Sequence, residues 1–112
     1  MQEPNRNPTK STLSPARARL VELMQRKNFC TFLDLSVSDG QPVLDPPPRL
    51  IREIKPGSEN GPRPELRLGD YALKAQVVEM FDLMDAMGTG VIKTLEVKHG
   101  LPFRMTIEED AA

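Results

Sequence analysis

Two similar segments, sixty residues apart, constrain the fold of this 112-residue chain more than any other feature of its sequence. Residues 20–43 align with residues 80–103 without a gap. The identical positions are Leu23/Leu83, Met24/Met84, Leu35/Leu95, Val37/Val97, Gly40/Gly100 and Pro42/Pro102. We therefore expect two equivalent units, each made of a helix followed by a pair of strands.

The first unit begins with a helix that we expect to start at Ser14-Pro15 and to end near Asn28. Serine caps the first turn of a helix, and proline at the first helical position loses no hydrogen bond. Residues 31–38 then alternate between apolar and polar side chains, which is typical of a half-buried strand. Asp39-Gly40 supplies a pair of residues that suits a tight hairpin turn.

Three consecutive prolines, Pro46–Pro48, interrupt the return strand that we expect to start at Val43. Proline has no backbone N–H to donate to a sheet, so this stretch is an edge, a kink or an extended left-handed segment. We expect residues 49–55 to resume the strand.

The second unit follows a linker at residues 56–69, which is rich in glycine, proline and charge. We expect a helix over Asp70–Met87, capped by Asp70, because apolar residues recur there at helical spacing. Val91–Lys98 and Phe103–Glu108 are the expected strands, joined by a turn at His99-Gly100. Residues 1–13 are expected to be a disordered arm and residues 109–112 a loose tail.

A helix with a single hairpin buries little apolar surface, so two such units must cover each other. The sequence predicts one α+β domain at residues 14–108, with units at about 14–55 and 70–108. Its four-stranded antiparallel sheet would carry both helices on one face. Lys93 falls on the expected inward face, which requires a bulge or a position beyond the covered sheet. Across the helices, Arg19 or Arg26 would meet Glu79 or Asp82.

The overall composition excludes several classes of function. The formal net charge is −1, which gives no global attraction to nucleic acid or to an anionic membrane. No apolar run is long enough to span a bilayer, and no secretory signal is visible. The single cysteine, Cys30, cannot form an internal disulfide, so a cytoplasmic location is the simplest expectation.

No residue pattern indicates catalysis, a cofactor or a metal, so we expect a protein that is not an enzyme. His99, the only histidine, occupies a turn, and no partner for general base chemistry lies near it in sequence. Cys30 has no neighbouring base that would activate it. The carboxylates Glu79, Asp82 and Asp85 are more typical of a solvated helix face than of a cation site.

The irregular, basic stretches are the remaining candidates for function, and they predict a binding or adaptor module. A proline segment followed by arginine can present a pre-ordered extended helix to an aromatic groove. The same stretches also suit stiff loops that protect a sheet edge. The predicted binding residues, for protein or phosphate, are Pro46, Pro47, Pro48, Arg49, Arg52, Arg63, Arg67, Arg17 and Arg19.

The alternative hypothesis is a nucleic-acid-associated protein that contacts phosphates through a basic N-terminal arm and helix. The front of the chain is basic, with six Lys and Arg against two Glu in residues 1–27. A sheet that reads RNA bases is not indicated, because Phe32 would be the only ring on the open face. Homodimerisation is a further expectation, since four strands leave two edges.

Overall fold

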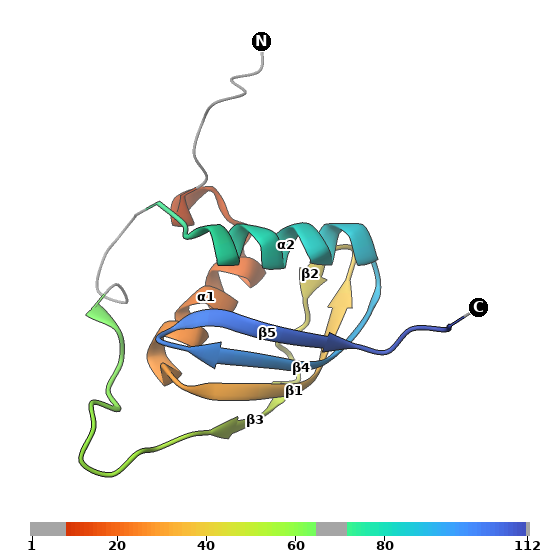
Figure 1. The fold of residues 1–112 in the computed structure, drawn as a ribbon. Helices are drawn as coiled ribbons and strands as arrows, with labels where there is room; N and C mark the ends of the chain where they lie inside the picture. The colour runs from red at the N-terminus through yellow and green to blue at the C-terminus, as the bar shows by residue number, and fades with distance from the viewer. Residues whose placement is uncertain (1–8, 65–71, 112) are drawn as a thin grey trace.

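The computed structural model describes residues 9–64 and 72–111, which form two helices and a curled antiparallel sheet (Figure 1). The elements are η1 (Lys10–Thr12), α1 (Pro15–Lys27), β1 (Cys30–Ser38), β2 (Gln41–Pro42), β3 (Arg49–Arg52), α2 (Ala75–Met87), β4 (Gly90–Lys98) and β5 (Leu101–Ile107). Ser14 caps α1 by accepting the N–H of Arg17, as the sequence predicts. The α+β class is therefore confirmed.

The sheet has the order β2-β1-β4-β5, and β3 also pairs with β1. β2 lies opposite one end of β1, where Val37 faces Pro42, and β3 lies opposite the other end, where Leu33 faces Arg49. Both segments run antiparallel to β1, so together they form one return strand that the prolines interrupt. This matches the expected break at Pro46–Pro48.

Both helices and one face of the sheet share a single core. Leu20 and Met24 of α1 and Met80 and Met84 of α2 are fully buried in it. The sheet contributes Cys30, Phe32, Leu35, Val37, Ile92, Leu95 and Val97. Burying these aliphatic side chains supplies the main driving force for folding, at about 1.5–3 kcal/mol each.

The two hairpin turns attach to the ends of the two helices. Gly40 donates its N–H to Gly88 O at 2.7 Å, and Gly100 donates its N–H to Asn28 O at 2.9 Å. Each turn is thereby tied to the C-terminal cap of the helix that lies in the other half of the chain. Both glycines have positive φ, 75° and 74°, which glycine adopts without steric cost.

Asp34 changes the side-chain alternation that the sequence predicts for β1. Its φ of 51° interrupts the regular pleat, so Phe32 and Leu35 both face the core although they are three positions apart. Phe32 is therefore a core residue, and the prediction that it supplies the ring of the open face is wrong. Lys93, opposite Asp34, is exposed at a register shift in β4, which confirms the expected bulge.

A second register shift moves Phe103 to the open face. The pairing of β4 with β5 shifts between Glu96 and Val97, so Phe103 is an extra residue in β5. Its side chain is 54% exposed and lies under Lys98 and Arg104, with the Lys98 ammonium 4.2 Å from the ring centre. Strict alternation placed Phe103 inward, and the bulge overturns that prediction.

Helix α2 begins later than the sequence suggests. Lys74 occupies the cap position and the helix starts at Ala75, so Leu73 packs on the core from outside the helix. The predicted cap, Asp70, lies outside the described residues. The apolar spacing of this segment does not by itself distinguish a helical turn from an apolar residue just before one.

The packing around Gly40 leads to a stability prediction. A Cβ at this position would lie 3.0 Å from Asp85 Oδ1 and 3.4 Å from Arg17 Nη2, whereas a Cβ at Gly57 would meet nothing within 4 Å. Both residues have positive φ, so Gly40→Ala and Gly57→Ala share the backbone strain. We expect about 1 kcal/mol of destabilisation for Gly57→Ala and about 2–3 kcal/mol for Gly40→Ala. Urea unfolding measures both, and equal losses would contradict the crowding.

Candidate docking surface at the proline segment and β3

The proline segment, defined here as Pro46–Pro48, lines a hollow beside β1. Proline cannot continue the ladder, so the chain leaves β1 after β2 and returns at Arg49. The resulting hollow has a volume of about 250 Å³ and is lined by Leu33, Asp34, Ser36, Val43, Pro46, Pro47, Pro48 and Arg49. Pro46 and Pro47 are exposed, so a partner can reach them.

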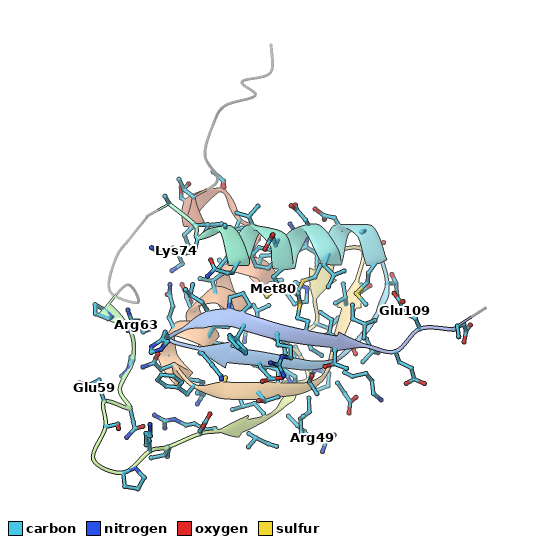
Figure 2. All side chains as sticks on the ribbon, in the orientation of Figure 1. Arg49, Glu59, Arg63, Lys74, Met80 and Glu109 are labelled. Carbon is cyan, nitrogen blue, oxygen red and sulfur yellow. The ribbon has the colours of Figure 1, made fainter. Side chains whose placement is uncertain are left out.

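Strand β3 places basic and apolar side chains next to the proline segment. Arg49 is 74% exposed, although it donates to Asp34 Oδ2 at 3.0 Å (Figure 2). Ile51 and Ile54 are 60% and 59% exposed, which is unusual for large aliphatic side chains. Sequence reasoning missed both isoleucines, because exposure depends on which strand is the outermost.

Arg52 is held by the loop that follows β3. Its guanidinium donates to Asn60 O at 3.0 Å. Asn60 organises this loop through its amide, which accepts from Lys55 N and donates to the carbonyls of Lys55 and Ser58, each at 3.0 Å. The linker that composition suggested is thus a hydrogen-bonded loop over its described part. Arg52 remains exposed within it.

Arg63 does not join the proline segment. Its backbone donates to Gln25 O at 2.9 Å, and its side chain packs at Gly100, where an added Cβ would lie 2.7 Å from Arg63 Cγ. It lines a separate polar cavity of about 430 Å³ beside Phe29 and His99. The structure therefore does not gather the predicted arginines at one place, and Arg67 lies outside the described residues.

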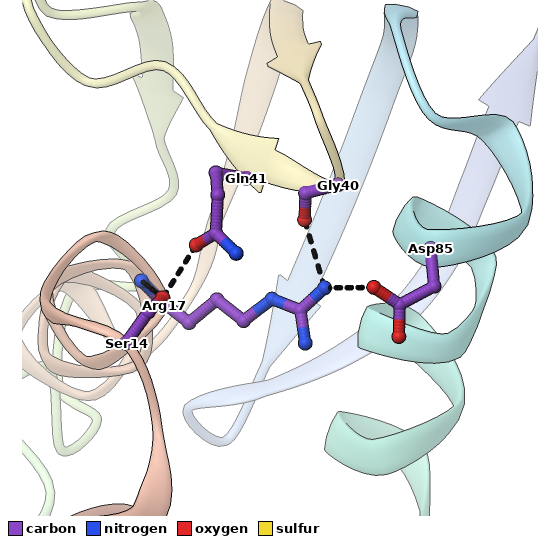
Figure 3. A network of polar contacts seen from close by, with 5 residues as sticks. All are labelled: Ser14, Arg17, Gly40, Gln41 and Asp85. Carbon is purple, nitrogen blue, oxygen red and sulfur yellow. Dashed lines mark hydrogen bonds and ion pairs between the residues drawn. The ribbon is translucent and has the colours of Figure 1, made fainter.

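Arg17 is engaged inside the fold (Figure 3). Its guanidinium donates to Gly40 O at 2.8 Å and to Asp85 Oδ1 at 2.5 Å, and it lies 4.9 Å from the ring centre of Phe81. It links α1, the β1–β2 turn and α2, and Ser14 extends the network by donating to Gln41. The expected partners, Arg19 or Arg26 with Glu79 or Asp82, form no ion pair within the described residues.

The basic front of the chain is partly neutralised within the molecule. Lys10 pairs with Glu22 at 2.6 Å, and Arg17 pairs with Asp85. Arg19 is exposed on α1. Residues 1–8, where the rest of the predicted arm lies, are outside the described residues.

The titratable candidates are placed in structural roles by their contacts. The His99 ring packs edge-on against Phe29 with ring centres 4.8 Å apart, and its φ of 56° fits the turn. Cys30 is buried in the core, and this desolvation raises the pKa of its thiol to about 11, although Lys27 and Arg52 partly offset the rise. A thiol with such a pKa is a poor nucleophile at neutral pH.

The chain matches no family model, and no curated protein or solved structure proved similar to it. No helix within residues 9–64 and 72–111 is long and apolar enough to cross a membrane. In the same part of the chain, no three His, Cys, Asp or Glu side chains are grouped as metal ligands would be. Function must therefore be argued from the surface itself.

The buried thiol predicts a pH dependence of stability. The folded state keeps the Cys30 proton up to a pKa of about 11, whereas the unfolded chain loses it near the model value of 9.0. The stabilisation is fully present below pH 9 and is lost as the pH rises toward 11. We expect wild-type stability to fall relative to Cys30→Ala over this range in urea titrations. Parallel pH profiles would refute the assignment.

The Arg17 network predicts unequal effects at its two ends. The Arg17 side chain is 15% exposed and that of Asp85 is 62% exposed. Arg17→Met removes the donor to Gly40 O as well as the ion pair, so we expect a loss of about 1–3 kcal/mol. Asp85→Ala removes only a surface pair, worth less than about 1 kcal/mol. Thermal or urea unfolding compares the two, and a larger loss at Asp85 would contradict this view.

Proposed function

We propose that this chain is a small, non-enzymatic binding module that docks on another protein through Pro46–Arg52. The observation that carries the proposal is the exposed proline segment, held stiffly beside a hollow and next to the exposed Arg49. Prolines restrict the chain before binding, so less conformational entropy is lost when a partner is engaged. Arg49 would add a charge-assisted contact at the end of the segment.

Protein docking is favoured over phosphate contacts by the fate of the basic residues. Arg17 and Lys10 are paired with carboxylates, so α1 offers fewer uncompensated cations than its sequence implies. Surface cations follow a nucleic-acid backbone well only when many act together. The proline segment and the exposed isoleucines instead suit an apolar partner groove.

We also propose that the domain arose as two equivalent αββ units. Helices α1 and α2 have bounds offset by sixty residues, as do strands β1 and β4. The central register supports equivalence, because the pair Phe32↔Leu95 becomes the pair Ile92↔Leu35 when the halves are exchanged. Leu35 and Leu95 are both fully buried, and the paired bonds of Gly40 and Gly100 follow the same exchange.

A reducing, cytoplasmic setting remains part of this proposal. The chain carries one cysteine, and Cys30 is a free thiol buried in the core. Structural disulfides are typical of oxidising compartments, and a single buried thiol does not need one.

The docking proposal predicts that a partner depends on this surface and not on charge or proline elsewhere. The double variant Pro47→Ala/Arg49→Ala should lose at least about tenfold in affinity, because it removes both the stiff segment and its charged end. Immobilised wild type and variant, exposed to extract of the native cell, would be compared by quantitative mass spectrometry.

The matched control changes another exposed proline and another exposed arginine, as Pro62→Ala/Arg19→Ala. It should retain the partners that the wild type captures. Recovery of the same proteins by all three chains would contradict docking through Pro46–Arg52. Loss with the control alone would move the surface to α1.

A further inference from the structure

Strand β3 has one side without a partner strand among the described residues. It pairs with β1 alone, and Figure 1 shows it as the outermost strand on that side of the sheet. Glu53 N donates to Phe29 O at 2.9 Å, so Glu53 directs its backbone toward β1. Because alternate residues of a strand point their backbone groups to opposite sides, Leu50 and Arg52 direct theirs to the open side.

The side chains along one face of this edge are self-complementary. Arg49, Ile51 and Glu53 alternate on the face away from the core, and all three are exposed. Read in one direction they are positive, apolar and negative. An antiparallel copy of the same segment reads negative, apolar and positive opposite them.

We propose that β3 pairs with β3 of a second copy of this chain, antiparallel and about a twofold axis at Ile51. Arg49 then lies opposite Glu53 of the second copy, and the two Ile51 side chains lie opposite each other. On the other face, Leu50 lies opposite Arg52, whose aliphatic stem can cover it. The result is one sheet that runs continuously through both copies.

The backbone geometry agrees with this register. With Ile51 at the axis, Leu50 and Arg52 of the two copies exchange about four hydrogen bonds. The two Ile51 residues form a pair without mutual hydrogen bonds, in which side chains lie closest. Pro48 has no N–H, so the ladder ends there, and Ile54 of the other copy lies opposite it.

A second copy explains features that a monomer leaves without a role. Ile51 and Ile54 are the two most exposed large apolar side chains within the described residues, and both enter this interface. A twofold interface also closes after two chains, so it protects the edge of β3 from open-ended assembly. A parallel pairing in register would instead place Arg49 against Arg49.

The pairing does not depend on the docking proposal. Pro46 and Pro47 lie before the ladder and remain outside it. In the dimer the two proline segments stand at opposite ends of the paired strands. Failure of one proposal therefore leaves the other intact.

Sedimentation equilibrium of charge-reversed chains tests the interface. Arg49→Glu and Glu53→Arg should each weaken the dimer at least about tenfold, because each puts like charges opposite at two symmetric places. An equimolar mixture of the two variants should recover a dimer, since every cross-chain pair is again opposite in sign. The double variant Arg49→Glu/Glu53→Arg should recover it as well.

The controls separate the interface from folding and from the Arg49–Asp34 pair. Glu53→Arg leaves that pair intact, and circular dichroism checks that each variant is folded. Arg19→Glu, a reversal on the exposed face of α1, should leave the dimer unchanged. A monomeric wild type up to about 1 mM, or a dimer that neither single reversal weakens, would overturn the proposal.

A crosslink tests the register directly. Opposed residues of a non-hydrogen-bonded pair have Cα atoms about 4.5 Å apart, which a disulfide can bridge. Ile51→Cys should form a covalent dimer under mild oxidation, while Ser38→Cys, exposed at the other end of β1, should not. Cys30 is buried and does not compete. Equal crosslinking of both variants would refute the register.

Discussion

The antiparallel pairing of β1 with β4 is the interaction on which the rest of this structure depends. These strands lie at the centre of the sheet, and their inward residues, including Phe32, Leu35, Ile92 and Leu95, form the floor of the core. Both helices bury their apolar stripes on that floor. Without this pair each helix and its hairpin would expose most of its apolar surface to water.

The core pairing also decides where irregular structure is tolerated. The centre of the sheet accepts a positive φ at Asp34 because the residue is exposed and its carboxylate meets Arg49 and Lys93. The proline interruption lies on the outer side of β1, where a missing hydrogen bond is replaced by solvent. Both departures create surface next to β3. The proposed docking surface and the proposed dimer edge therefore follow from one break in the return strand.

Charge serves a different purpose in the two halves of the molecule. Between the helices, Arg17 joins Gly40 and Asp85 and fixes how the turn meets α2. Along β3, Arg49 and Glu53 are exposed and remain available to another chain. The same residue type is thus structural where it is enclosed and is a candidate for recognition where it is not.

The sequence by itself determined the order of elements, the cap at Ser14, the hairpin turns at Gly40 and Gly100, and the break at the prolines, because these depend on local backbone chemistry. Tertiary structure decided that Phe32 faces inward, that Phe103 faces outward and that Arg17 is enclosed. Bulges and packing set these outcomes, and neither follows from side-chain alternation. The exposure of Ile51 likewise required knowing that β3 is an outermost strand, since an apolar residue in a strand is ordinarily assigned to the core.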